Sequence, residues 1–239
     1  MKYTFTGAPA HQMTAWNGRN ALTAVMHLFD NVDAVRSNMR PEARIQGIIT
    51  EGGAAPNVVP DRTQADFYIR YPDEVYLKQV REFVDNAAKA AALATGTHVK
   101  IDNYGSARDG ISVATLAEPA FALMKLYGAK KLAEQPGKPQ GFEESGSVSR
   151  DIPGTGFAAY TSDAPNHTYE MNEDNLKAVG HEGFKVQAQA MAALLEVFAT
   201  RPELRTAVTR EFDGIKALFG DYVGALEKVY TVPKIAEGK

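Results

Sequence analysis

The chain has 239 residues, a formal net charge of −3 and a hydrophobic content of 44%. A chain of this length can bury one large core or two modest ones, and we expect two. The slight negative charge and the lack of a Lys/Arg run argue against nucleic-acid binding and against binding to an anionic membrane surface. No apolar stretch approaches the ~20 residues that span a bilayer, and residues 1–4 carry no apolar signal segment.

The chain contains no cysteine. It therefore has neither disulfides nor thiolate metal ligands, and any metal site must be built from His, Asp and Glu side chains. With no targeting segment in the sequence, we take the cytoplasm as the default location.

The first part of the chain predicts a β-α-β-β-α-β succession. Strands are expected where apolar and polar residues alternate, and helices where apolar residues recur at helical spacing. Asp73 is a plausible N-cap of the second helix, and Gly96 closes it. The predicted elements are strand 2–6, helix 16–36, strands 43–50 and 65–70, helix 74–94 and strand 97–103. This order is the ferredoxin-like arrangement.

The second part is mostly helical in pattern. Helices are predicted at 113–127, at 175–199 and from Pro202 to about Leu218, with a thin tail after them. Residues 156–160 are the one predicted buried strand. An α/β layer needs several strands for its helices to cover, so this part is too poor in strands to form a domain alone.

A single histidine lies on the turn after the first strand, in Thr6-Gly7-Ala8-Pro9-Ala10-His11, and Asn17-Gly18-Arg19-Asn20 follows it. A histidine on a strand-to-helix turn is placed to act on a ligand. Single histidines that are satisfied by backbone groups are also common in such turns. Spacing alone leaves both readings open.

Three segments together resemble the dinuclear-metal aminoacylase/carboxypeptidase family of amidohydrolases. The first is the His11 turn with residues 17–21, and the second is Glu51 to Pro60 followed by Tyr68-Ile69-Arg70. The third is Pro165-Asn166-His167-Thr168 with residues 178–183. The whole chain aligns in order with that family, and it is most similar to the p-aminobenzoyl-glutamate hydrolase branch.

The resemblance implies an α+β and α/β architecture in two domains. Residues 1–104 would form the ferredoxin-like lid, which makes a homodimer, and residues 105–239 the C-terminal portion of the α/β metallopeptidase-type catalytic domain. The complete site of the family holds zinc or manganese. The substrate implied is an N-acyl or N-aroyl amino acid such as p-aminobenzoyl-glutamate.

The resemblance also implies roles for four residues. His11 would reach the partner's active site, bind the substrate carbonyl and stabilise the oxyanion, while Asn57 and Arg70 would hold the substrate carboxylate. His167 matches the one metal ligand from the C-terminal half. These side chains suit their roles, because an imidazole can donate to an oxyanion, arginine forks onto a carboxylate, and neutral imidazole binds zinc. Alternatively, Asn57 caps a turn between prolines and Arg70 is an ordinary surface residue of a strand.

The family's remaining ligands and general base belong to an N-terminal half that the sequence does not contain. No His-x-Asp occurs, and we do not assign the paired Glu143 and Glu144 as the base. We therefore expect that this chain neither holds the metal tightly nor hydrolyses an amide alone. The missing half is either supplied by a second chain or lost by truncation. The alternative is a non-catalytic dimerisation or ligand-binding module. A metalloenzyme built from His11, His167 and carboxylates of this chain alone is disfavoured by its ligand spacing.

Overall fold

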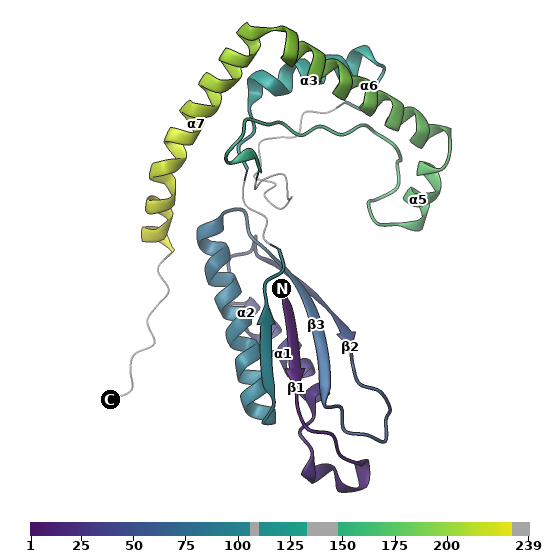
Figure 1. The fold of residues 1–239 in the computed structure, drawn as a ribbon, viewed down its shortest axis with the longest axis vertical. Helices are drawn as coiled ribbons and strands as arrows, with labels where there is room; N and C mark the ends of the chain where they lie inside the picture. Colours follow the sequence, from purple (N-terminus) through teal and green to yellow (C-terminus); the bar gives the residue numbers. More distant parts are fainter. Residues whose placement is uncertain (106–109, 133–147, 231–239) are drawn as a thin grey trace. The chain divides into compact units, whose positions relative to one another are not determined.

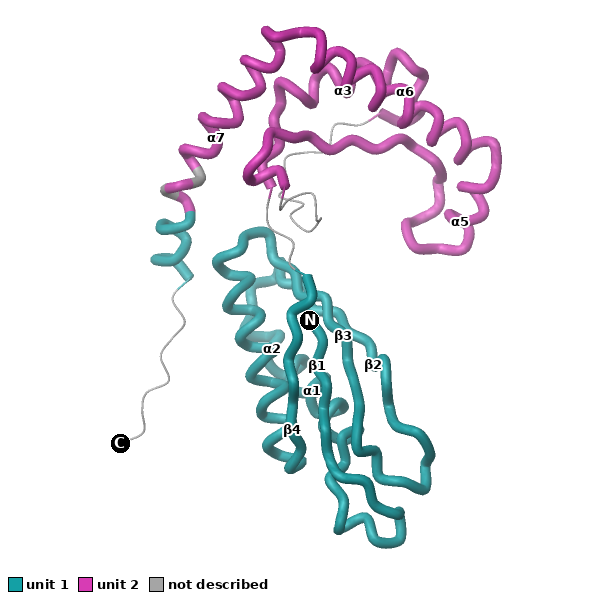
Figure 2. Tube along the Cα trace, in the orientation of Figure 1, with its two compact units in different colours: residues 1–109, 140–144, 223–239 teal, residues 110–139, 145–222 magenta. Residues whose placement is uncertain are grey.

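The structure is a computed structural model that describes residues 1–105, 110–132 and 148–230, apart from the side chains of Phe219 and Asp221. The chain divides into two compact units (Figure 2). Unit 1 comprises Met1–Asp109, Gln140–Glu144 and Val223–Lys239, and unit 2 comprises Gly110–Pro139 and Ser145–Tyr222. None of the helices in the described ranges is long and apolar enough to cross a membrane.

Unit 1 is built on a four-stranded antiparallel sheet with strand order β2-β3-β1-β4 (Figure 1). The strands are β1 (Lys2–Thr6), β2 (Arg44–Glu51), β3 (Arg62–Arg70) and β4 (His98–Asp102), and the helices are α1 (Ala21–Arg36) and α2 (Glu74–Thr95). The succession β1-α1-β2-β3-α2-β4 confirms the predicted ferredoxin-like arrangement.

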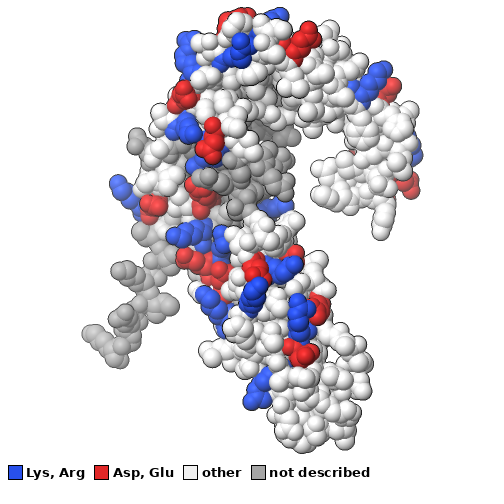
Figure 3. Space-filling model, viewed as in Figure 1, with Lys and Arg blue, Asp and Glu red and all other residues white. Residues whose placement is uncertain are grey.

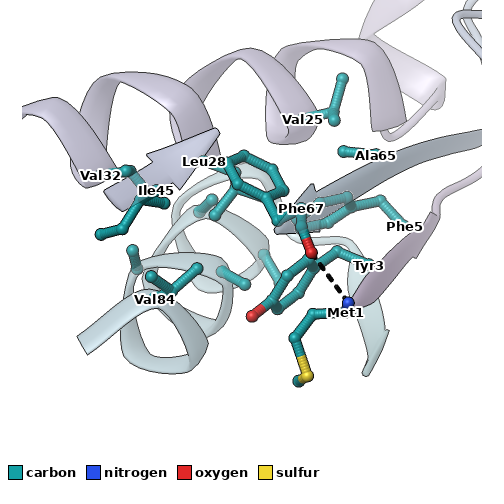
Figure 4. Close-up of a cluster of buried hydrophobic side chains, with 14 of the residues drawn as sticks. Met1, Tyr3, Phe5, Val25, Leu28, Val32, Ile45, Ala65, Phe67 and Val84 are labelled. Atoms are coloured by element: carbon teal, nitrogen blue, oxygen red, sulfur yellow. Dashed lines mark hydrogen bonds between the residues drawn. The ribbon is translucent and has the colours of Figure 1, made fainter. Parts of the chain in front are cut away.

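Successive side chains of each strand point to opposite faces of the sheet, and one of these faces lies against the core. Tyr3, Phe5 and Phe67 are fully buried against the helices, whereas their neighbours in the strands lie on the opposite face. Figure 4 shows this cluster, in which the Met1 amino group donates to the Phe67 carbonyl oxygen at 2.8 Å. The helices contribute small and branched apolar residues to the same core: Ala21, Ala24, Val25, Leu28 and Val32 from α1, and Val80, Val84, Ala87, Ala88, Ala91 and Ala92 from α2.

Capping residues set the helix ends in unit 1. Asp73 accepts a hydrogen bond from the Tyr76 N–H at 2.8 Å, and Gly96 ends α2 in the left-handed region with φ of 66°, both as predicted. The prediction that a helix begins at residue 16 is wrong. Asn20 accepts from the N–H groups of Leu22 and Thr23 and so starts α1 at Ala21, while a separate 3-10 turn, η1 (Gln12–Asn17), precedes it.

Unit 2 contains α3 (Ala114–Leu126), α5 (Tyr169–Asn175), α6 (Ala178–Thr200) and most of α7 (Pro202–Val229). Its described residues form two small apolar clusters, one around Val113 and Phe212 and one around Met124 and Val186. The predicted helices at 113–127 and 175–199 are confirmed within a few residues. The third prediction was too short, because helix-forming residues carry α7 on to Val229.

The predicted strand at residues 156–160 does not form. Among the residues that the structure describes, the segment has no pairing partner, and the nearby Gly154 forms an isolated bridge with Ser112. The apolar residues that suggested a strand are used in packing instead, since Phe157 and Ala159 lie against the Met124 cluster and the Phe157 carbonyl accepts from Gln187 Nε2 at 3.0 Å. A short apolar run predicts burial better than it predicts a ladder partner.

Candidate functional site

Two loops pair with each other at one end of the sheet of unit 1. We call residues 7–19 the His11 loop and residues 52–61 the Asn57 loop. The first follows β1 and the second precedes β3, and these strands are antiparallel neighbours, so both loops start from the same sheet end. Three backbone hydrogen bonds of 2.7–3.0 Å join the loops: Gly7 N to Asp61 O, Gln12 N to Asn57 O, and Val59 N to Ala10 O. A reciprocal pair between Ala8 and Arg19, of 3.0 and 2.9 Å, closes the His11 loop.

Gly7 allows the close approach on which this pairing depends. A Cβ atom built on Gly7 would overlap the carbonyl oxygen of Arg19, which accepts the hydrogen bond of Ala8 N–H. Gly7 does not need the left-handed region, so space alone excludes a side chain. Its position just after β1 therefore fixes how tightly the His11 loop folds back on itself.

His11 is the N-cap residue of η1. Its backbone is extended, with φ of −67° and ψ of 141°, and its Nδ1 atom accepts a hydrogen bond from the Met13 N–H at 3.1 Å. The residue also forms an isolated antiparallel bridge with Val58. The imidazole remains exposed although its backbone is held on both sides.

Asn57 lies on the segment that pairs with the His11 loop. Its carbonyl oxygen accepts from the Gln12 N–H at 3.0 Å, and its side chain is exposed. The structure therefore brings the predicted site residues His11 and Asn57 onto adjoining segments of one loop pair.

Arg70 lies at the other end of the sheet. It is the last residue of β3 and pairs with Arg44, whereas Arg62 at the start of β3 pairs with Thr6 next to the His11 loop. Eight residue steps along a strand correspond to roughly 27 Å. Within one protomer, the structure does not bring Arg70 to His11.

The open face of the sheet around Arg70 is polar. The Arg70 guanidinium lies 5.4 Å from the centroid of the Tyr68 ring. On the same face the Tyr104 hydroxyl donates to Asp66 Oδ1 at 2.6 Å, and this hydrogen bond raises the pKa of Tyr104 to about 12. An arginine fork at such a surface can take part in binding a carboxylate.

His167 lies in unit 2, in the turn before α5. It is exposed and has φ of 67°, and Thr168 after it caps α5 by accepting from the Met171 N–H at 3.2 Å. Among the residues that the structure describes, no three His, Asp or Glu side chains gather as a metal site would require. The described part of the chain therefore does not fit a metal centre by itself, and Glu143 and Glu144 lie outside it.

The sequence prediction missed the apolar surroundings of His11. Met13 and Trp16 of η1 are 76% and 75% exposed, and Val58 is also exposed. Neither loop tip, residues 7–18 or 52–60, contains a charged residue, and the corresponding end of unit 1 is largely white in Figure 3. The lack of charge was visible in the sequence, but η1 was not, because histidine is not a usual N-cap residue.

Residues 1–96 match the model of the peptidase dimerisation domain of the M20 type. The chain is 32% identical over 209 residues to the Xaa-Arg dipeptidase of Mus musculus, covering 82% of this chain and 47% of that protein. It is 30% identical over 236 residues to the Xaa-Arg dipeptidase of Homo sapiens, covering 93% and 52%. The chain thus spans about half the length of the curated relatives it matches.

A solved structure shares the fold. The hydantoinase/carbamoylase family amidase from Burkholderia ambifaria aligns with a TM-score of 0.50 and 16% sequence identity, over 81% of this chain and 46% of that chain. At this identity the likeness concerns the fold alone.

Proposed function

The chain belongs to the M20-type peptidase family, and on this premise we propose that it forms the lid and the C-terminal part of a metal-dependent amide hydrolase. Residues 1–104 are the dimerising lid, and residues 105–239 complete part of the catalytic domain. The substrate is an N-acyl or N-aroyl amino acid or a dipeptide. The observation that carries the proposal is the paired loop end of unit 1, which presents an exposed imidazole at His11 beside the exposed amide of Asn57.

In this proposal His11 donates a hydrogen bond to the scissile carbonyl oxygen as that oxygen becomes anionic. The uncharged loop tips around it suit this role, because a donor acts more strongly where no other charge competes for it. Asn57 and Arg70 bind the carboxylate of the substrate. Since Arg70 lies at the far end of β3 in each protomer, His11 and Arg70 reach one substrate only from different protomers of the dimer.

The dimer forms through the edge strand β2. Ile48 and Ile49 on this edge are 64% and 43% exposed, which is unusual for isoleucine in a strand. The other edge, β4, is protected by charge, because Lys100 Nζ lies 2.8 Å from Asp102 Oδ1. An apolar, unpaired edge is the one that adds a second copy most readily.

Peptidases of the M20 type are generally metal-dependent. We assign His167 as the ligand that this chain contributes, because a neutral imidazole is a common ligand of zinc and manganese. The remaining ligands and the general base come from another polypeptide.

The test is an amide-hydrolysis assay of the purified chain together with any polypeptide that co-purifies, after zinc or manganese is added. The panel contains N-acetyl amino acids, p-aminobenzoyl-glutamate and dipeptides ending in arginine. The His11→Gln substitution should lower kcat about 100-fold with little change in KM, the usual effect of removing an oxyanion donor. His27→Gln is the matched control, because His27 is exposed on α1 outside both loops, and it should leave kcat unchanged.

Two results would contradict the catalytic proposal. One is hydrolysis that His11→Gln does not slow. The other is a stable dimer that cleaves no member of the panel with either metal and retains no second polypeptide, which would establish the non-catalytic dimerisation or ligand-binding module instead.

A further inference from the structure

The hydrogen bond that caps η1 determines which nitrogen of His11 carries the proton. The Met13 N–H donates to Nδ1 at 3.1 Å. A neutral imidazole has one N–H, and the nitrogen that accepts a hydrogen bond is the one without hydrogen. From this geometry we infer that neutral His11 is held as the Nε2–H tautomer, with the backbone amide of Met13 as the positioning group.

The turn holds the Met13 amide in place by several independent contacts. The His11 carbonyl oxygen accepts from the Thr14 N–H at 2.8 Å and from the Thr14 hydroxyl at 3.3 Å. On the outer side, Gln12 N and Ala10 O bond to the Asn57 loop. The donor to Nδ1 is therefore a backbone group of a closed turn, which loses little conformational entropy on forming the bond.

A carboxylate is the usual alternative partner of a histidine ring nitrogen, and it would select the opposite tautomer by accepting from Nδ1–H. Neither loop tip contains an Asp or Glu. No ion pair of His11 with a carboxylate occurs among the described residues, whereas His27 Nδ1 lies 3.8 Å from Asp30 Oδ2. The backbone amide is thus the group that selects the tautomer at His11.

The Nε2–H tautomer defines the class of ligand that His11 takes. Nε2 with its hydrogen donates to a carbonyl or anionic oxygen, and in this form it can neither bind a metal ion nor accept a proton. Protonation of the ring would place hydrogen on both nitrogens and remove the bond from Met13. In its neutral form His11 therefore donates through Nε2. The assignment of this donor to the oxyanion rests on the proposed function, while the tautomer itself does not.

The experiment is a long-range 1H–15N correlation spectrum of the 15N-labelled full chain at a pH at which its histidines are neutral. The five histidine rings are assigned through single His→Gln substitutions. The ratio of Nε2–H to Nδ1–H tautomer at His11 should exceed that at the exposed His98 by about fivefold, the factor given by one net hydrogen bond of about 1 kcal/mol. An equal ratio, or protonation of Nδ1 at His11, would overturn the inference.

A matched pair of variants tests the role of the amide. Met13→Pro removes the N–H, and Met13→Ala keeps it while shortening the exposed side chain. The His11 ratio should fall to that of His98 in the first and stay high in the second, with the amide signals of the sheet unchanged in both. If Met13→Pro disturbs the sheet, the comparison of His11 with His98 in the wild-type chain still tests the tautomer. The tautomer ratio is measured by spectroscopy, so it tests the tautomer even if the chain shows no activity in the hydrolysis assay.

Discussion

Gly7 is the residue whose replacement should do most to the candidate site. Gly7→Ala drives a methyl group into the carbonyl oxygen of Arg19 and forces the Ala8–Arg19 bridge apart. We expect the free energy of unfolding of unit 1 to fall by about 1–3 kcal/mol, as for other overpacked positions. Urea titration followed by circular dichroism measures this change.

Gly105→Ala is the matched control for Gly7→Ala. Gly105 lies in unit 1, and no atom of the described residues lies within 4 Å of a Cβ built on it, so the free energy of unfolding should stay within about 0.5 kcal/mol of wild type. Equal effects of the two substitutions would mean that the His11 loop does not fold back on itself as described.

Tyr230 is a second residue with a measurable role, and it packs, partly buried, against the core of unit 1. Its hydroxyl donates to Asp73 Oδ2 at 2.8 Å, and its ring lies 5.1 Å from that of Tyr76, with the Arg40 guanidinium 4.5 Å from its centroid. Tyr230→Phe removes only the hydroxyl. The carboxylate of Asp73, a residue that is 5% exposed, then loses one hydrogen-bond donor. The free energy of unfolding should fall by about 1 kcal/mol at pH 7.

The effect of Tyr230→Phe should depend on pH. Burial, together with the hydrogen bond to Asp73, raises the pKa of Tyr230. The neutral phenol therefore stabilises the fold fully below the unfolded pKa of about 10, and this contribution is lost as the pH rises above it. Urea titrations between about pH 8 and 11 should show wild type approaching the variant, and a constant difference would contradict the described hydrogen bond.

At the scale of elements, Glu211 of α7 caps another helix, α3. Its two carboxylate oxygens accept from the N–H groups of Ala114 and Thr115 at 2.8 Å each, while the N-cap residue Val113 offers no side-chain bond. Glu211→Ala should therefore lower the free energy of unfolding of unit 2 by about 1 kcal/mol. Glu196→Ala, at an exposed position of α6, is the control and should be nearly neutral.

The Glu211 cap also has a pH signature. Hydrogen bonds from Thr115 and Ala114 lower the pKa of Glu211. The contribution of the Glu211 cap to the free energy of unfolding is thus present above the unfolded pKa of about 4.3, and it is lost as the pH falls through the lower pKa of the folded state. Thermal unfolding between about pH 3 and 7 should show the two proteins converging at the acidic end. Persistence of the difference at low pH would argue against a carboxylate cap.

The elements also show what the sequence could predict. The order of elements in unit 1 could be predicted because its signals are local. Alternating apolar residues mark the strands, and Asp73 and Gly96 mark the two ends of α2. The pairing of His11 with Val58 joins residues far apart in the chain and left no local signal. The wrong strand prediction at residues 156–160 has a related cause. The apolar residues there indicate burial locally, but they do not reveal that the described part of the chain offers no strand for them to pair with.

At the level of the whole molecule, the proposed dimer uses the sheet edge at β2 and leaves the edge at β4 outside the interface. Ile48→Arg adds a charge to the apolar edge β2, and His98→Arg adds one to the opposite edge β4. Both positions are exposed in the single chain, so neither change should affect folding by more than about 0.5 kcal/mol. Sedimentation velocity should find that Ile48→Arg weakens the dimer at least tenfold and that His98→Arg does not. The opposite pattern would place the interface on β4.

We propose that this chain carries the dimerising lid of an M20-type peptidase and needs further ligands to hold its metal. Native mass spectrometry of the purified chain, before and after zinc is added, tests it most directly because it reads stoichiometry, metal content and co-purifying polypeptides together. We expect a homodimer that holds zinc tightly only when a second polypeptide is bound. A monomer at all concentrations, or a chain that binds two zinc ions tightly by itself, would contradict it.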